Sequence, residues 1–371
     1  MKCSISNIAN VISESIPNPA ESEFDIFVGL EHYDSGEVKV TRYGSTQNLV
    51  TAVKVFRKGD ILLARRNVYL KRAGLVDFDG VTSGDSIVLR VKDDLSSLSL
   101  QSEDIRMYLP FVLNTEEFWN YAEKYSDGTM SKRLSPKTLL QYEFDIPDDV
   151  TEKNRLLWQA YKTKESYKAM ILATDEMVKS QFIEMFGNPV TNPMGWSTKP
   201  LCQVAPESPS NTKMKGRVWV LNLDMIESNS GCIINKVFED SDDLNSVAAF
   251  DEGNVLFSKL RPYLNKVTIP DGKGYATTEL VPLRPHTDEL RQHFLSFLLR
   301  TDEFVKYADG IATGTKMPRM PMTALREFKC ILPPTELQDL FCGISKQADK
   351  SKFELKQAIE KVDKVMRALM Q

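Results

Sequence analysis

GNVLFSKLRPYLNKV, residues 253–267, is a faint second copy of GDILLARRNVYLKRA, residues 59–73. In both stretches a glycine precedes an apolar run, and a basic cluster and a tyrosine follow it. The glycines and the tyrosines keep one offset, since Tyr69 pairs with Tyr263 and 263 − 69 = 194. An apolar run bounded by glycine and charge is typical of a β-strand. Each copy therefore predicts a strand that ends in a basic loop.

The repeat extends well beyond these two stretches. VGLEHYDSG at residues 28–36 resembles LNLDMIESNSG at residues 221–231. Downstream, LNTEEFWNYAEKYSDGT ends at Thr129 and resembles LRTDEFVKYADGIATGT, which ends at Thr315, an offset of 315 − 129 = 186. Landmarks that keep their order at offsets near 190 in a chain of 371 residues indicate two halves of one design.

Each half closes with a long helical pattern, predicted at residues 151–187 and 335–371. Apolar or small residues in the second pattern follow an unbroken 4–3 spacing, which is typical of a coiled coil. They are Leu337, Phe341, Ile344, Ala348, Ser351, Leu355, Ala358, Val362, Val365 and Leu369. The first pattern has a rougher seam of Leu157, Tyr161, Ile171, Val178, Phe182 and Met185. By the symmetry of the halves, we expect the two helices to pair antiparallel as a spacer of roughly 50 Å.

The remainder of each half reads as α+β. Short apolar runs such as DILLA, SIVLRV, NVLFS and LVPLRP predict strands, and YLPFVLNTEEFWNYAE and FLSFLLRTDEFVKYAD predict amphipathic helices. The expected fold is two similar globular domains, related by a pseudo-twofold and separated by a long antiparallel two-helix coiled coil. The predicted segments are a first domain at 1–148, a central helix at 149–188, a second domain at 189–333 and a C-terminal helix at 334–371.

Composition places the chain among soluble globular proteins, with 42% hydrophobic and 26% charged residues. No apolar run is long enough to span a membrane and no export signal is visible. The five cysteines form no CxxC pair, which favours a cytoplasmic protein with buried free thiols. The net charge is −4, yet seven basic residues lie between Lys54 and Arg72 against one acid, Asp60. A basic patch is a footprint for phosphates, and a solvated edge strand is the alternative.

These stretches together resemble the specificity (S) subunit of type I restriction–modification systems. The resemblance covers essentially the whole chain and rests on GNVLFSKLRPYLNKV, VGLE, ARRNVYLKR with FDGVTSGDSIVLR, KSQFIEMFG and ILPPTELQ. It implies two target-recognition domains, each reading one half of a bipartite sequence in double-stranded DNA. It also implies helices that bind two methylation (M) subunits, which methylate adenine, and restriction (R) subunits that cleave unmodified DNA as a host defence. The S subunit itself holds no cofactor.

The basic loops supply the candidate DNA-binding residues, because arginine and lysine bind phosphates or guanine and asparagine binds adenine. In the first half they are Arg65, Arg66, Asn67, Tyr69, Lys71 and Arg72, and in the second half Lys259, Arg261, Tyr263, Asn265 and Lys266. Basic residues after the glycine turns form a second group, Lys132, Arg133, Lys316 and Arg319. Surface solubility is the alternative for any single basic residue, and packing support is the alternative for the tyrosines. The loops differ in sequence, so we expect different half-sites.

Signals of catalysis are weak. Asp25 with Glu37-Val38-Lys39 only loosely resembles a nuclease motif, and GIATGTK at 310–316 lacks the spacing of a phosphate loop. No tetrapeptide typical of amino-methyltransferases occurs, and the histidines are isolated, which predicts no metal site. The sequence thus favours a binding subunit without catalytic residues. A stand-alone tandem DNA-binding regulator, or a two-headed scaffold without enzyme partners, is the alternative. The outer surface of the long helices would discriminate between them.

Overall fold

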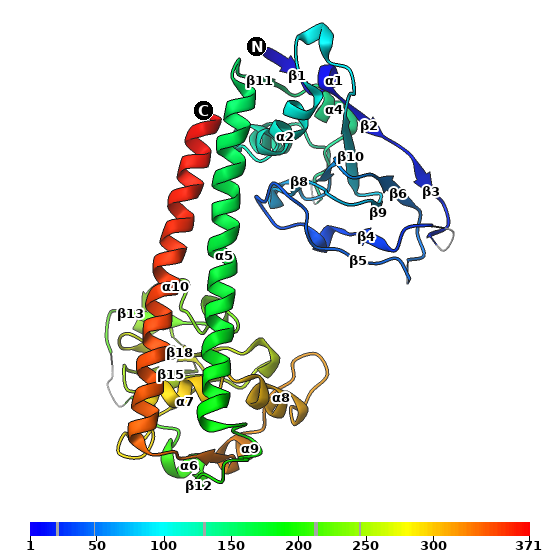
Figure 1. Cartoon of the computed structure of the whole chain (residues 1–371). Helices are drawn as coiled ribbons and strands as arrows, with labels where there is room; N and C mark the ends of the chain where they lie inside the picture. Colours follow the sequence, from blue (N-terminus) through cyan, green and yellow to red (C-terminus); the bar gives the residue numbers. More distant parts are fainter. Residues whose placement is uncertain (20–21, 48, 129–130, 211–213, 245) are drawn as a thin grey trace. The chain divides into compact units, whose positions relative to one another are not determined.

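The computed structural model describes residues 1–371 except 20–21, 48, 129–130, 211–213 and 245. The chain forms two compact units: Met1–Tyr167 with Gln357–Gln371, and Lys168–Lys356 (Figure 1). The long helices α5 (Val150–Phe186) and α10 (Thr335–Met370) each contribute one part to each unit. Thr129, a landmark of the repeat, lies outside the described residues. The finer division of the chain at 148, 188 and 333 stays a prediction.

Among the described residues of the first unit, the strands form three sheets. One is the antiparallel pair β1 (Lys2–Ser4) and β11 (Glu143–Asp145). The second has the strand order β2-β10-β7-β8: Ala9–Ile12, Ser86–Val91, Ile61–Ala64 and Ala73–Leu75. The third has the order β3-β6-β9-β4-β5: Ser15–Ile16, Val53–Phe56, Gly80–Thr82, Ile26–Val28 and Gly44–Ser45. The helices are α1 (Ile5–Ile8), η2 (Leu30–His32), η3 (Val68–Leu70), η4 (Ser96–Leu98), α2 (Ser102–Val112), α3 (Glu116–Lys124) and α4 (Pro136–Leu140).

The second unit repeats this plan. Its antiparallel pair is β12 (Thr198–Pro200) with β20 (Lys329–Ile331). Its other sheets are β17-β16-β19, at Val267–Thr268, Val255–Ser258 and Leu280–Leu283, and β14-β13-β18-β15, at Val237–Asp240, Arg217–Leu221, Gly274–Thr277 and Val247–Phe250. The helices are α6 (Leu201–Val204), η5 (Leu223–Met225), η6 (Ser241–Asp243), η7 (Pro262–Leu264), α7 (Gln292–Leu298), α8 (Asp302–Gly310) and α9 (Met322–Glu327).

Strand pairing confirms that the units are two versions of one fold. β4 pairs parallel with β9 in the first unit, as β13 pairs parallel with β18 in the second. The neighbours of β9 and β18 on the other side, β6 and β15, are antiparallel in both units. β7 lies between β8 and β10, as β16 lies between β17 and β19. The prediction of an α+β fold with two similar domains is therefore confirmed.

Local chemistry repeats along with the topology. Thr115 caps α3 by accepting a hydrogen bond from the backbone N–H of Phe118, and Thr301 caps α8 in the same way from Phe304. Acidic residues fill the first turn of both helices, where they favour the positive end of the helix dipole. Both phenylalanines are fully buried. The sequences NTEEF and RTDEF thus specify the same helix start and the same core contact.

The long helices close the main core of each unit. In the first unit Leu157 and Tyr161 of α5 are buried, and Met366 and Leu369 of α10 pack against the same cluster. In the second unit Phe182 and Phe186 of α5 and Phe341 of α10 are fully buried in one aromatic cluster. The predicted seam on α10 holds except at Val365. Val365 is 54% exposed, and its neighbour Met366 packs against the core together with the last seam residue, Leu369.

Two further observations, on the cysteine thiols and on the apolar character of the helices, relate to what was expected from composition. The thiols of Cys202 and Cys232 are exposed, so the expectation of buried thiols is wrong for them, whereas Cys3, Cys330 and Cys342 are buried. All five cysteines are free. Over the part of the chain that the structure describes, no helix combines the length and the apolar character needed to cross a bilayer.

Candidate nucleic-acid interface

Both basic loops fold as a short 3-10 turn with a left-handed residue on each side. Asn67 (φ 55°) and Lys71 (φ 49°) flank η3, and Arg261 (φ 48°) and Asn265 (φ 48°) flank η7. Asparagine tolerates this conformation, but a positive φ is strained for arginine and lysine. The strain persists because backbone hydrogen bonds fix the loop, as between Asn67 N–H and the Lys132 carbonyl at 2.9 Å. The equivalent bond joins Arg261 N–H to the carbonyl of residue 318 at 2.7 Å.

Three segments converge at each loop. The carbonyl of Arg65 accepts from Leu134 N–H at 2.8 Å, and that of Lys259 accepts from Met320 N–H at 2.9 Å. These bonds attach the turn that follows α3 or α8 to the loop. Besides the loop and this turn, the third segment is the turn before β10, which contributes Asp85, or the turn before β19, which contributes Glu279. We name these surfaces the first platform (residues 65–72, 131–133 and Asp85) and the second platform (residues 259–266, 316–319 and Glu279).

The outer side of each platform carries cations and an aromatic ring. Arg66, Arg133 and Tyr69 are exposed in the first platform, and Tyr69 is 59% accessible. In the second platform Arg261, Tyr263 and Lys316 are exposed. The interpretation of the tyrosines as packing supports is therefore wrong. An exposed guanidinium beside an exposed ring is suited to contacts with phosphates and with base edges or faces.

Other candidates point inward. Arg72 donates to the backbone carbonyl of Leu30 at 2.8 Å, and Lys266 donates to that of Leu223 at 2.6 Å. Burial lowers the pKa of Arg72 from its usual value. These two residues occupy equivalent positions and connect the loop to the sheet behind it. They support the platform from within and are less available for contact with DNA than their exposed neighbours.

The structure changes the role predicted for Asn265 and Lys71, the residues at the end of the two loops. Asn265 is only 4% exposed and donates to the carbonyl of Arg300 at 3.0 Å, so it is a core residue and not a surface contact. Its equivalent, Lys71, is partly exposed and pairs with Glu116 on α3 at 2.6 Å. Each residue ties its loop to the helix layer of its own unit. Lys132 similarly donates to the carbonyl of Glu123 at 3.2 Å.

The basic run from Lys54 to Arg72 does not form one patch. Lys54 donates to the carbonyl of Ser86 at 2.7 Å, and burial lowers its pKa. Arg57 lies near Glu14 and stacks on the ring of Phe24. The alternative of a solvated edge strand is also wrong, because β6 and β7 both lie in the interior of their sheets.

Sequence reasoning missed the acid in each platform. Asp85 comes directly before β10 and Glu279 directly before β19, and 279 − 85 = 194, the offset of the basic loops. Arg133 lies 3.3 Å from Asp85, and Arg319 forms hydrogen bonds of 2.8 and 3.0 Å with Glu279. This pairing raises the pKa of Arg319. The common offset was the signal that could have found these two acids.

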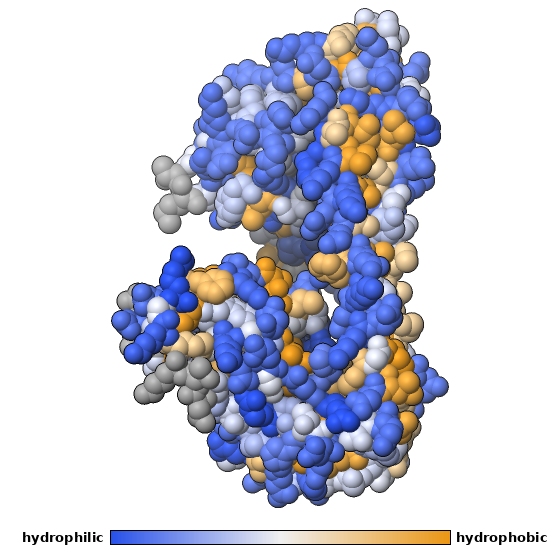
Figure 2. Space-filling model, turned by 90° about the vertical axis from the view of Figure 1, so that its left-hand side faces the viewer, coloured by the Kyte–Doolittle hydropathy of each residue, from blue (hydrophilic) through white to orange (hydrophobic). Residues whose placement is uncertain are grey.

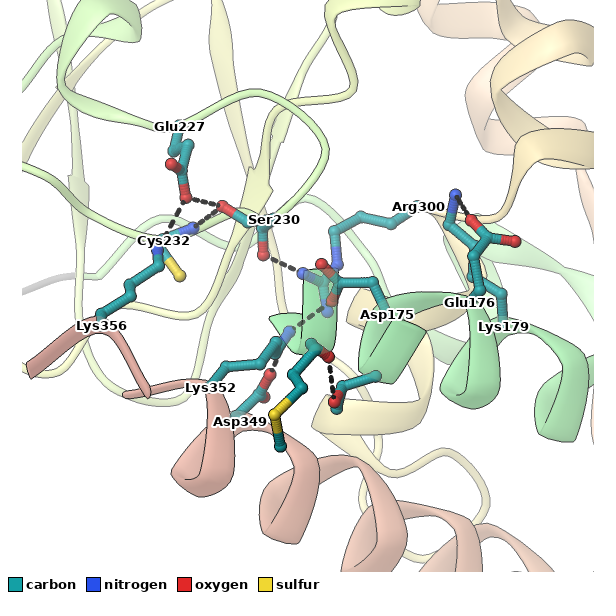
Figure 3. A network of polar contacts seen from close by, with 12 residues as sticks. Asp175, Glu176, Lys179, Glu227, Ser230, Cys232, Arg300, Asp349, Lys352 and Lys356 are labelled. Atoms are coloured by element: carbon teal, nitrogen blue, oxygen red, sulfur yellow. Dashed lines mark hydrogen bonds and ion pairs between the residues drawn. The ribbon is translucent and has the colours of Figure 1, made fainter. Parts of the chain in front are cut away.

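Ion pairs link the two long helices to each other and to a loop of each unit. In the second unit Lys356 of α10 lies 3.4 Å from Glu227, and Lys352 bridges Asp175 of α5 at 2.6 Å and Asp349 at 2.9 Å (Figure 3). Ser230, in the loop after η5, accepts a hydrogen bond from Arg300 through its carbonyl and donates through its hydroxyl to Glu227, the carboxylate that pairs with Lys356 (Figure 3).

In the first unit Lys164 of α5 bridges Glu37 at 3.2 Å and Asp363 of α10 at 3.0 Å. Glu37, the acid of the weak nuclease pattern, is thus used in a structural ion pair. Lys39 of the same pattern stacks over the ring of Trp158 at 5.4 Å.

Comparisons with known proteins agree with this architecture. No model of a protein family matches the sequence. Over 85 residues the chain is 32% identical to the type I restriction enzyme EcoDI specificity subunit of Escherichia coli, a match that spans 23% of this chain and 18% of that relative. A chain from a structure on complex assembly and conformational transition of the type I R-M system matches with a TM-score of 0.52 and 17% identity, over 100% of this chain and 96% of that chain.

A second solved structure, the type I restriction–modification S subunit from M. genitalium, matches with a TM-score of 0.51 and 13% identity over 100% of this chain and 94% of that one. The chain therefore has the fold of type I specificity subunits, and the resemblance seen in the sequence is confirmed at this level.

Proposed function

We propose that this chain is the DNA-recognition subunit of a type I restriction–modification complex and has no catalytic residues of its own. The observation that carries the proposal is the duplicated platform: one strand–loop–turn arrangement, with an exposed arginine and an exposed tyrosine, built twice on one topology. Each platform would read one half of a bipartite target in double-stranded DNA. Fold-level similarity to type I specificity subunits supports the same function.

Differences between the platforms support the reading of unlike half-sites. The exposed Arg66 stands where the second platform has Leu260, and the exposed Arg261 stands where the first platform has Asn67. Arginine can bind guanine and asparagine can bind adenine through two hydrogen bonds, whereas leucine can do neither, so equivalent positions would favour different bases. Tyr69 and Tyr263 are exposed in both platforms and would make contacts that the two half-sites share.

The outer faces of the long helices support docking of methylation and restriction subunits. Large apolar side chains are exposed on α5 and α10, although both helices also contribute side chains to the cores: Met170, Leu172, Met177 and Ile183 on α5, and Leu340, Phe353 and Val365 on α10. Figure 2 shows hydrophobic patches between hydrophilic areas on one face of the molecule. Apolar side chains on a helix face that the chain itself leaves uncovered are typical of a partner interface.

The proposal is tested by co-expressing the chain with a type I methylation subunit and sequencing the DNA for methyladenine. We expect a bipartite motif that disappears when this chain is omitted. A second measurement is co-purification of the two proteins. Leu172→Glu should weaken the complex, whereas the control Glu176→Gln, a polar exchange at an exposed position of the same helix, should not. A chain that binds specific DNA but no methylation subunit would favour the stand-alone regulator instead.

A further inference from the structure

The acids of the two platforms stand in one structural position. The carbonyl of Asp85 accepts from Arg65 N–H at 2.9 Å, and the carbonyl of Glu279 accepts from Lys259 N–H at 3.0 Å. The backbone of each acid is thus hydrogen-bonded to the first residue of the basic loop. Both acidic side chains are largely covered, with 28% of the Asp85 side chain and 21% of the Glu279 side chain accessible.

Each carboxylate faces the arginine that follows the second turn. Asp85 lies 3.3 Å from Arg133 and is shared with Arg66 at 3.7 Å. Glu279 binds Arg319 more completely, since Nε donates at 3.0 Å and Nη2 at 2.8 Å to Oε1. A carboxylate that takes one edge of a guanidinium fixes its plane and leaves the remaining N–H groups pointing in a set direction. About half of the Arg133 side chain and 43% of the Arg319 side chain remain accessible.

A carboxylate is an unexpected group in a surface that meets phosphates, because it repels the DNA backbone whatever the sequence. It can nevertheless improve discrimination. It weakens binding to all DNA by a similar amount, and it strengthens binding only where the fixed guanidinium finds its base partner. This role explains why both units hold a negative charge at the same place.

We propose that Asp85 and Glu279 are specificity-determining positioning residues, which hold Arg133 and Arg319 in the orientation that reads a base and suppress binding to other DNA. The inference rests on the proposed function and deepens it, because it names, for each half-site, the residue that orients a base-reading arginine. The two residues act through their arginines and need not touch a base themselves.

The test uses the full chain in its complex with the methylation subunit and compares wild type with Asp85→Asn and Glu279→Gln. For Glu279→Gln we expect affinity for DNA lacking the motif to rise roughly threefold at about 0.15 M salt, because one repulsive charge is removed. The ratio of specific to nonspecific affinity should fall by roughly tenfold, the loss of one well-oriented base contact. Methylation sequencing should show relaxed base preference at one position of the second half-site only.

Asp85→Asn should relax the first half-site only, so each variant contains its own control in the unaltered half. Glu207→Gln is the matched control, because it breaks another arginine–carboxylate pair of the second unit, that with Arg326, outside the platform. Glu279→Asp keeps the charge and should keep low nonspecific affinity, which a purely structural role would not predict. An unchanged motif and affinity ratio in folded Glu279→Gln overturns the inference. Absence of any motif with the wild-type chain overturns the proposed function itself.

Discussion

Replacing Phe182 by alanine probes the aromatic cluster through which α5 is held in the second unit. The ring is fully buried, and its centroid lies 5.1 to 5.5 Å from those of Phe186, Phe294, Phe297 and Phe341. Truncating a buried phenylalanine costs about 3–5 kcal/mol through lost transfer energy and the cavity that remains. The four ring contacts place this site toward the upper end, so we expect a loss of about 4 kcal/mol.

Urea unfolding followed by hydrogen–deuterium exchange and mass spectrometry would measure this loss separately in peptides of each unit. With a slope of about 2 kcal/mol per molar urea, the midpoint of the second unit should fall by about 2 M. Phe353→Ala, on the exposed face of α10 at 61% accessibility, is the control and should change stability by less than about 0.5 kcal/mol. A loss below about 1.5 kcal/mol for Phe182→Ala, or equal losses for both variants, would refute the described packing.

Three further predictions concern backbone space, a buried charge and pH. Gly274→Ala should destabilise the second unit by about 2 kcal/mol or more, because the new Cβ would lie 2.6 Å from a backbone oxygen and from a phenylalanine ring, whereas Gly272→Ala, with 3.9 Å to its nearest neighbour, should be tolerated. Asp60→Asn should cost about 2 kcal/mol, because Asp60 is 1% exposed and accepts two hydrogen bonds of 2.7 Å from Arg90. Burial lowers the pKa of His293 below 6.5, so the folded chain binds this proton less readily than the unfolded chain. Stability should therefore be full above pH 6.5 and fall as the pH drops below it, and His293→Gln should remove that part of the pH dependence.

Thermal unfolding, recorded at several pH values, checks all three. Equal melting temperatures for the two glycine variants would contradict the close approach of the backbone at residue 274. An Asp60→Asn variant as stable as wild type would mean that the pair with Arg90 contributes nothing. A melting temperature of the His293→Gln variant that falls as steeply as wild type below pH 6.5 would assign the acid sensitivity to other groups.

The architecture could be predicted from the sequence because the two halves of the chain repeat the same landmarks. Repeated landmarks located the strand–loop elements, and the seam of α10 was predicted correctly except at Val365. Pairing of β4 with β9 was not predictable, since the two strands are far apart in sequence and no local pattern encodes a parallel neighbour. The inward packing of Met366 in place of Val365 was also missed, because the spacing alone does not show which of two adjacent apolar residues a core covers.

At the candidate site, the sequence located the loops but not the direction of each side chain. Arg66 and Arg72 belong to one basic run, yet only the first is exposed, because the positive φ at Lys71 turns the following residue toward the sheet. Asn265 was assigned to DNA by residue type, but its side chain is buried and donates to the carbonyl of Arg300. Asp85 went unnoticed because an acid carries no signal for DNA binding until the arginine beside it is known.

The central claim, that each platform reads its own half of a DNA target, is tested most directly by methylation sequencing with the single variants Arg66→Ala and Arg261→Ala. Both side chains are exposed, so folding should be unchanged. The account predicts that Arg66→Ala relaxes or abolishes base preference in one half of the motif and Arg261→Ala in the other, with the gap between them unaltered. Variants that change both halves together, or neither, would contradict it.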